Sequence, residues 1–166
     1  MGIDISGAHR TPVVAAHDGT ITKTHGQRDK QGGLEVWLES PLLDEEESSN
    51  SRVRTLYCHL DEWVVSEGQE VKQGDVIGFM GNTGMVISGG NVFWGNAPAG
   101  VGTHLHFGLY EFKKENGKWK PRYTNVLKNT SDPLPYLTES PVNPNGDMSG
   151  SAVLLSNMLA YLKLFF

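Results

Sequence analysis

Residues 102–109, with the sequence GTHLHFGL, constrain the fold more than any other stretch because they place two histidines on one side of a β-strand. The run is rich in apolar, aromatic and small residues and has glycines around it, which is typical of strands. Side chains alternate between the two faces of a strand, so His104 and His106 share one face while Leu105 and Phe107 take the other. The roots of the two imidazoles then lie roughly 7 Å apart. Such a pair either serves one metal ion and one reacting group, or is a chance pair of surface histidines.

The rest of the chain is punctuated by turn residues, which predicts an all-β fold. Among its 166 residues are 20 glycines and 8 prolines, a composition that indicates many turns between short strands. The length fits one domain with a sizeable core. The formal net charge of -5 argues against a nucleic-acid-binding protein, which would carry a basic stripe. Cys58 is the single cysteine, which excludes an intrachain disulfide and a cysteine-rich zinc site.

The start of the chain predicts a short strand. In residues 1–5 the two isoleucines take one face and Asp4 takes the other. With a core on the isoleucine side, the carboxylate faces either solvent or a polar site.

Two dipeptides of the turn-forming type predict β-hairpins. Residues 11–16 and 20–22 are apolar runs that flank Asp18-Gly19, and an Asp-Gly pair in this position is typical of a hairpin turn. Residues 113–120 surround Asn116-Gly117 in the same way.

A longer pair of strands is predicted at residues 34–43 and 52–60, on either side of an acidic loop. The second strand ends with Cys58 and His59. Adjacent residues of a strand point to opposite faces, so His59 cannot act as the base for Cys58, and a thiol protease is excluded. If His59 points at a site, we expect Cys58 to point into the core.

Residues 85–101 predict a loop rich in glycine and asparagine that contains Phe93 and Trp94. Long loops with aromatic side chains commonly serve function. The two aromatics either wall a substrate groove beside the histidine strand or fold under the loop as a plug.

Changes in composition toward the C-terminus divide the chain into three segments. Residues 1–137 form the predicted domain, and residues 138–151, rich in Pro, Asn, Gly and Ser, form a linker. Residues 152–166 are apolar with helical spacing but shorter than the ~20 residues that span a bilayer. This tail is either a truncated membrane helix, a short helix docked on the domain, or a segment that contacts a partner.

Four side chains can point to one side of such a sheet: Asp4, His59, His104 and His106. A catalytic zinc site takes three protein ligands, from imidazole or carboxylate, and leaves a position open for water. The ion lowers the pKa of that water toward ~7 and polarises the substrate carbonyl. Spare imidazoles then move protons or stabilise the oxyanion. One carboxylate and three histidines match this inventory.

In order along the chain, six motifs resemble the lysostaphin/LytM-type zinc metallopeptidases, which cleave peptide cross-links of bacterial peptidoglycan. The motifs lie within residues 2–111 and are GIDI, TPVVAAHDGTI, YCHL, GQEVKQGDVIG, GNTG and HLHF. The resemblance implies a β-rich fold related to the barrel-sandwich hybrid, with an antiparallel sheet under a groove. It implies that Asp4 and His106 bind one zinc ion and that His104 is the general base. His59 would be a second catalytic histidine that orients water or stabilises the tetrahedral intermediate.

The chain departs from the family pattern in two places. The family's first motif is His-x-x-x-Asp, and its histidine, the third zinc ligand, would fall just before Met1. The ligand set within these residues is therefore incomplete. The loop at residues 85–103 is longer than the family's usual link into HLH and can reshape or cover the groove.

The resemblance implies a zinc endopeptidase that acts on peptidoglycan peptides in the cell envelope, either periplasmic or extracellular. No export signal is visible at Met1, so we expect either a leader that has been removed or a fragment of a longer protein. One alternative is a degenerate, non-catalytic domain that binds peptidoglycan or activates a cell-wall amidase. The other is an unrelated H-x-H metal enzyme of β architecture.

Overall fold

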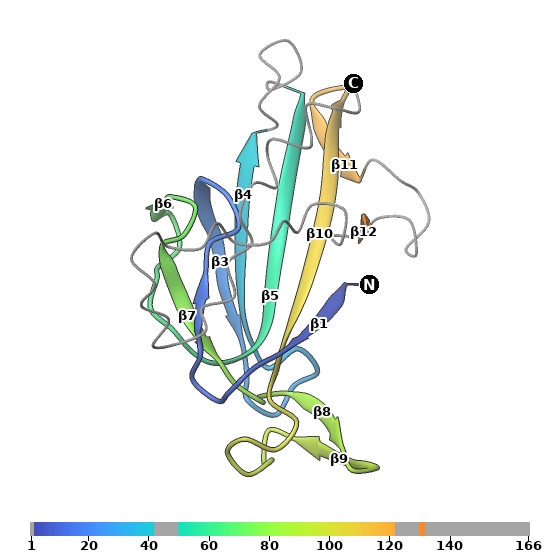
Figure 1. Ribbon diagram of the computed structural model, residues 1–166. Coiled ribbons are helices and arrows are strands. Elements are labelled where there is room, and N and C mark those ends of the chain that lie inside the picture. Colours follow the sequence, from blue (N-terminus) through green and yellow to red (C-terminus); the bar gives the residue numbers. More distant parts are fainter. Residues whose placement is uncertain (1, 42–49, 122–129, 132–166) are drawn as a thin grey trace.

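The computed structural model describes residues 2–41, 50–121 and 130–131, which form an all-β fold (Figure 1). The strands are β1 (Ile3–Ser6), β2 (Pro12–Val14), β3 (Gly19–Gly26), β4 (Leu34–Pro41), β5 (Ser51–Trp63), β6 (Glu70–Val71), β7 (Val76–Met80), β8 (Met85–Ser88), β9 (Asn91–Trp94), β10 (His104–Glu115), β11 (Lys118–Pro121) and β12 (Thr130–Ser131). Ten of them form one sheet, and β8 and β9 form a second, two-stranded sheet. The predicted all-β class with antiparallel pairing is confirmed.

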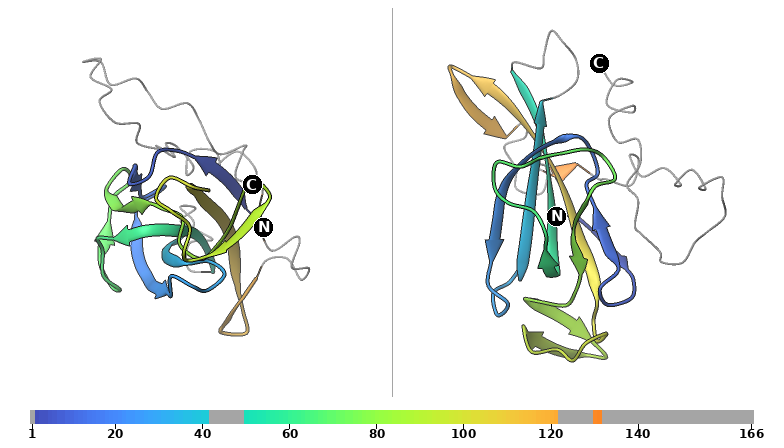
Figure 2. Two further views of the ribbon diagram at one scale, coloured as in Figure 1. Left: turned by 90° about the horizontal axis from the view of Figure 1, so that it is seen from below. Right: turned by 90° about the vertical axis from the view of Figure 1, so that its left-hand side faces the viewer.

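The two longest strands, β5 and β10, lie side by side at the centre of the main sheet. The order β1-β10-β5-β4-β3-β6 runs through them, while β7 pairs with the end of β5 and carries β2 on its other edge. The predicted pairing of the strands around the acidic loop is confirmed, because β4 and β5 are neighbours. Seen from below, the sheet is strongly curled (Figure 2).

The hydrophobic core lies on one face of this curled sheet. Leu105 and Phe107 of β10 are 1% and 0% exposed and point into it, as the alternation in the histidine strand predicts. Phe107 is paired with Tyr57 of β5, and their rings meet edge to face with centroids 5.3 Å apart. Burial of a large apolar side chain contributes about 1.5–3 kcal/mol, so this pair anchors the strand whose other face carries both histidines.

One buried histidine belongs to the core and has no part in the groove. His17 is 0% exposed, and its Nδ1 donates to the carbonyl oxygen of Asp18 at 2.7 Å. Its Nε2 lies 3.1 Å from the Thr55 hydroxyl, which lies 3.2 Å from the Tyr57 hydroxyl. The Tyr57 oxygen in turn accepts the backbone N–H of Ala16 at 2.8 Å. Burial lowers the pKa of His17, so it is held in the neutral form.

The hairpin predicted around Asp18-Gly19 is wrong. Strand β2 pairs with β7, whereas β3 pairs with β4 and β6. The turn is held instead by another part of the chain, because Asp18 Oδ1 accepts the backbone N–H of Gln73 at 2.8 Å and Oδ2 accepts from Lys72 Nζ at 2.9 Å. The hairpin around Asn116-Gly117 is confirmed, since β10 and β11 pair across it and both residues have positive φ.

The segment predicted as a loop at residues 85–101 contains a second hairpin, so that prediction is wrong in part. Strands β8 and β9 pair from Met85 opposite Trp94 to Ser88 opposite Asn91. Gly89 and Gly90, both with positive φ, make the turn. The hairpin lies at one end of the main sheet (Figures 1 and 2).

The predicted linker at residues 138–151 and the predicted helix at residues 152–166 lie outside the described residues, as does the boundary at 137. Across the ranges that are described, no helix has the length and apolar character needed to cross a membrane.

Candidate metal centre and groove

Asp4 and His106 meet because β1 and β10 run antiparallel in a register that sets these two residues opposite each other. His106 Nδ1 lies 2.7 Å from Asp4 Oδ1. Their side chains are 32% and 65% exposed, so both are accessible from solvent on the face of the sheet opposite the core. A carboxylate oxygen and an imidazole nitrogen thus converge from adjacent strands.

His104 lies on the same face as His106 and turns its basic nitrogen toward Asp4. Its Nδ1 lies 2.8 Å from the carbonyl oxygen of Gly102. A carbonyl oxygen only accepts hydrogen bonds, so Nδ1 carries a proton, and in the neutral ring Nε2 then keeps its lone pair. That Nε2 is 3.9 Å from Asp4 Oδ1. His104 therefore presents a free base beside the Asp4–His106 pair.

His59 reaches the same place from β5 through an unusual backbone conformation. Its φ is 61°, in the left-handed region that non-glycine residues seldom adopt. Its ring centroid is 4.6 Å from that of His104 and 6.2 Å from that of His106. His59 Nδ1 donates to the carbonyl oxygen of Thr83 at 2.7 Å. In the neutral ring, Nε2 is then left as an acceptor.

The protonation of His59 follows from its surroundings. Burial lowers its pKa and the neighbouring His104 and His106 lower it further, while the hydrogen bond to Thr83 opposes them by raising it. The residue is 8% exposed. His59 therefore stays neutral in the range where an exposed histidine begins to protonate.

The prediction that Cys58 points into the core is wrong. Cys58 is buried, but it pairs with His106 across β5 and β10 and lines the same groove as His59. The positive φ at His59 interrupts the strand alternation, so two consecutive side chains reach one side. Burial raises the pKa of the Cys58 thiol, and the carboxylates of Glu35 and Asp4 add to this. The thiol therefore remains protonated and supplies no thiolate nucleophile.

The four candidate residues share one groove of about 690 Å³. Its floor includes Leu56 and Cys58 of β5, and Glu35 lies on its β4 side. Strand β8 supplies three more lining residues, Met85, Val86 and Ile87, whereas Phe93 and Trp94 of β9 are not among the lining residues. The hairpin thus walls the groove through β8. Trp94 is 51% exposed, whereas Phe93 is paired with the buried Val86 and is partly buried itself. The residues that line the groove include two carboxylates and no lysine or arginine.

Thr83 of the GNTG motif holds His59 in place, a role that the sequence reasoning missed. Besides the carbonyl contact, its hydroxyl donates to the Leu60 carbonyl at 2.7 Å and accepts the Leu34 backbone N–H at 2.9 Å. One side chain thus links β5 and β4 at the groove. The recurrence of the motif in the resembling family was the only signal that could have pointed to it.

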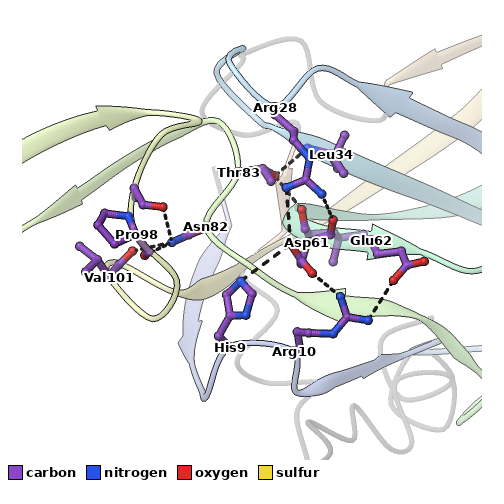
Figure 3. Close-up of polar contacts among 12 residues, drawn as sticks. His9, Arg10, Arg28, Leu34, Asp61, Glu62, Asn82, Thr83, Pro98 and Val101 are labelled. Atoms are coloured by element: carbon purple, nitrogen blue, oxygen red, sulfur yellow. Dashed lines mark hydrogen bonds and ion pairs between the residues drawn. The ribbon is translucent and has the colours of Figure 1, made fainter.

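Asn82 holds the segment that leads into His104 (Figure 3). Its Nδ2 donates to the carbonyl oxygens of Pro98 at 2.8 Å and Val101 at 3.0 Å. Asn82 is 8% exposed, so these bonds are shielded from water. The link is of long range and has no local sequence pattern that would predict it.

Asp61 of β5 contacts basic side chains from two loops (Figure 3). Its carboxylate contacts Arg10 Nη1 at 2.5 Å, Arg28 Nη1 at 3.4 Å and His9 Nε2 at 3.8 Å. Arg10 also donates to Glu62 at 2.9 Å. The arginines are half exposed or more, so each ion pair contributes little to stability by itself. Together the ion pairs of Asp61 tie the two loops to β5.

The donor atoms of Asp4 and His106 fit part of a zinc site, because zinc takes carboxylate oxygen and imidazole nitrogen. In the stretches that the structure describes, no group of three or more His, Cys, Asp or Glu side chains is arranged to hold a metal ion. Two donors are therefore in place, and the roles of the four residues stay predictions.

An antiparallel sheet that gathers Asp4, His59, His104 and His106 in one groove is the arrangement that the resemblance to zinc metallopeptidases implies. The chain belongs to peptidase family M23, whose family model matches residues 1–119. The predicted lysostaphin/LytM-type resemblance is confirmed.

Similar proteins include a metalloprotease and two endopeptidases, one of them named for peptidoglycan. The chain is 33% identical over 130 residues to an uncharacterized metalloprotease of Haemophilus influenzae, covering 78% of this chain and 22% of that protein. It is 29% identical over 152 residues to the glycyl-glycine endopeptidase ALE-1 of Staphylococcus capitis, covering 90% and 32%. It is 32% identical over 111 residues to the peptidoglycan DD-endopeptidase ShyC of Vibrio cholerae, covering 67% and 19%. The chain thus spans a third or less of the length of each of these relatives.

Two solved structures support the same fold. LytU superposes with a TM-score of 0.53 at 25% identity, covering 81% of this chain and 70% of that one. The catalytic domain of lysostaphin from Staphylococcus simulans superposes with a TM-score of 0.52 at 24% identity, covering 81% and 76%. The predicted lysostaphin-like fold is confirmed.

Proposed function

We propose that this chain is a zinc-dependent endopeptidase that hydrolyses peptide cross-links of bacterial peptidoglycan. The observation that carries the proposal is the convergence of His59, His104 and His106 with Asp4 in one open groove. Membership of family M23 and the names of two relatives, a glycyl-glycine endopeptidase and a peptidoglycan DD-endopeptidase, support the substrate class.

In the proposed mechanism Asp4 and His106, whose side chains meet across β1 and β10, would hold the ion. When bound, the ion polarises the scissile carbonyl and lowers the pKa of the attacking water. The open face of the sheet leaves room for an extended peptide above the pair.

His104 is the general base of the proposal. Because Nδ1 donates to the Gly102 carbonyl, Nε2 is the nitrogen without a proton in the neutral ring. It can therefore take a proton from the attacking water and return it to the leaving amine. Its position, 3.9 Å from Asp4 Oδ1, places it beside the proposed ligands without replacing one.

His59 fits the role of orienting water better than that of stabilising an oxyanion. Its Nδ1 proton is used by Thr83, and burial lowers its pKa. A neutral ring in this tautomer offers an acceptor at Nε2 and has no proton there for an oxyanion. We therefore assign His59 Nε2 to accepting a hydrogen bond from the water or from the substrate amide.

The activity also implies a place of action. A protein with this substrate acts in the cell envelope, periplasmic or extracellular, where peptidoglycan lies. Its partners are then peptidoglycan peptides, and the residues of the tail at 152–166 offer a contact to a membrane or to a partner. The acidic character of the groove and the net charge of -5 agree with a substrate other than nucleic acid.

The test is cleavage of purified peptidoglycan sacculi by the chain after treatment with a chelator and after addition of zinc. We expect loss of cleavage with chelator and its return with zinc. His104→Ala should lower the rate by roughly 10²–10⁴-fold, which is typical for loss of a general base. His25→Ala is the matched control, because His25 is exposed on β3 and lies outside the groove.

A parallel pair of chains carries either one histidine or one alanine added directly before Met1, four residues ahead of Asp4. The histidine chain should bind zinc more tightly and cleave faster. Binding to sacculi without cleavage, in a chain shown to be loaded with zinc, would contradict the proposal. It would support the alternative of a non-catalytic domain that binds peptidoglycan or activates an amidase.

A further inference from the structure

The β8–β9 hairpin carries an exposed apolar surface beside the groove. Five large hydrophobic side chains are exposed in the part of the chain that the structure describes, and three belong to this hairpin: Ile87 at 64%, Val92 at 54% and Trp94 at 51%. Scattered apolar residues on a surface are ordinary, but a cluster marks a site of interaction. The hairpin is therefore a candidate binding surface.

The exposed side chains form one face of the hairpin. Ile87 is paired with Val92 and Met85 with Trp94, and side chains of directly paired residues lie on the same face. The other face carries Val86, which is 1% exposed and packs against Gly102. We call Met85, Ile87, Val92 and Trp94 the outer face of the hairpin.

The outer face meets the groove along β8, because Met85 and Ile87 line the groove, whereas Val92 and Trp94 of β9 extend the apolar surface beyond it. The hairpin is also anchored at its base rather than free. Gly84 N–H donates to Arg28 O at 2.6 Å, Met85 N–H to Gln31 O at 3.0 Å, and Gly95 N–H to Gly84 O at 2.8 Å. A ligand that lies over the histidines and extends toward the hairpin therefore meets a preformed apolar wall.

The composition of the wall favours an uncharged ligand group. Residues 85–103 contain no Asp, Glu, Lys or Arg, and the carboxylates that line the groove are those of Asp4 and Glu35. A charged group against the wall finds no charged partner there, whereas an apolar group covers exposed apolar surface. The wall therefore fits an uncharged apolar side chain.

The ligand of the wall follows from the groove that the wall borders. Met85 and Ile87 line the same groove as His59, His104 and His106. In the proposed peptidase this groove holds the substrate, so the group that meets the wall belongs to a peptide.

We propose that the outer face of the β8–β9 hairpin is a subsite that binds an apolar side chain of the peptide substrate next to the scissile bond. The subsite rests on the proposed peptidase function and adds to it a substrate preference. Peptides with alanine or a larger apolar residue at this position are favoured over peptides with a charged one.

The test uses a series of peptides that differ at one position, with Ala, Leu, Asp or Lys, scanned on each side of the scissile bond. For the chain as it stands we expect kcat/KM to favour Leu over Asp by roughly tenfold or more at one position, the scale of a lost apolar contact in a pocket. The double variant Ile87→Thr, Val92→Thr keeps the β-branched shapes and removes apolar surface. It should reduce this ratio toward one.

Val76→Thr is the matched control, because Val76 is an exposed strand valine, at 44%, outside the groove. It should keep the preference. Thermal unfolding of all three chains shows whether the variants fold. A ratio near one in the unchanged chain, or a ratio that survives the double variant in a folded protein, overturns the subsite.

Calorimetric binding of the same peptides to the chain carrying His104→Ala separates the subsite from catalysis. If no peptide is cleaved by the zinc-loaded chain but Leu peptides bind better than Asp peptides, the peptidase proposal fails and the subsite stands. If peptides are cleaved but neither binding nor cleavage depends on the apolar residue, only the subsite fails. Sedimentation that shows a dimer dissociated by the double variant would assign the outer face to a second copy of the chain and overturn the proposal.

Discussion

Replacement of Asn82 by aspartate tests how the groove is assembled, because the change keeps the shape of the side chain and removes its donors. The Asn82 amide donates to the carbonyls of Pro98 and Val101 at 2.8 and 3.0 Å, and a third carbonyl, that of Ala97, lies 3.4 Å away. In Asn82→Asp a carboxylate oxygen would face these carbonyl oxygens. Two hydrogen bonds would be lost and acceptors would repel each other in a site that is 8% exposed.

The magnitude follows from the two bonds. Each buried hydrogen bond contributes about 0.5–1.5 kcal/mol, and leaving its partner unpaired costs about 1–3 kcal/mol. We expect a cost of about 3 kcal/mol, which corresponds to a roughly hundredfold change in an opening equilibrium. The loss should be concentrated in the segment from Pro98 to His104, because Asn82 holds that segment to the end of β7.

Hydrogen exchange is the assay, read at the backbone N–H of Val101, which donates to Pro98 O, and at that of His104, which donates to Gly81 O. Both should exchange roughly a hundred times faster in Asn82→Asp. Asn96→Asp is the control, because Asn96 is exposed and its Oδ1 accepts from the Trp94 N–H, a role that a carboxylate keeps. Unchanged protection in Asn82→Asp would refute the reasoning that this amide fixes the loop.

Three further predictions concern other residues. Burial lowers the folded-state pKa of His17 and His59, so unfolding takes up protons. The free energy of unfolding therefore falls as the pH drops below about 6.5. Denaturant titrations from pH 7 to 5 should show this fall, and His17→Gln should make it shallower. Thr83→Val, which keeps the shape but loses the hydroxyl, should cost about 1–3 kcal/mol of stability, and Thr83→Ser should cost less than half as much. Equal losses in chemical denaturation would contradict the role of the Thr83 hydroxyl in joining β5 and β4. Because burial raises its pKa, Cys58 should react at pH 8 far more slowly with a thiol reagent than free cysteine and at the ordinary rate in denaturant; rapid labelling of the folded chain would contradict the placement.

Features that local patterns decide could be predicted from the sequence. Alternation placed Leu105 and Phe107 in the core and left both histidines of β10 on the other face. The Asn116-Gly117 turn formed as predicted because β10 and β11 are neighbours along the chain. These features depend on side-chain period and turn chemistry, both of which can be read within ten residues.

Prediction failed where distant contacts override a local pattern. Asp18-Gly19 has the same turn chemistry, but backbone and side-chain donors of Gln73 and Lys72 bind Asp18 and carry the chain from β2 to β3 without a hairpin. Regular alternation in β5 puts Leu56 and Cys58 on the groove face, and the positive φ of His59 brings the next side chain to the same face. No periodicity predicts a single left-handed residue within a strand.

The candidate site itself lay between these two cases. Alternation alone puts Asp4 and His106 on exposed faces, but their pairing is a register between residues that are about a hundred positions apart. The ordered motifs supplied that juxtaposition, whereas the supporting contacts of Thr83 and Asn82 came only from the structure. Local patterns therefore identified which side chains can act, and long-range packing decided how they are held.

The zinc affinity of single variants, measured by competition with a coloured chelator, tests the central claim most directly. If Asp4 and His106 hold the ion while His104 acts beside it, Asp4→Ala and His106→Ala should each weaken zinc binding by more than about tenfold, since even loss of a supporting partner costs that much. His104→Ala should keep the affinity of the unchanged chain and lose cleavage. Zinc binding that is unaffected by Asp4→Ala, or lost equally in His104→Ala, would contradict the account.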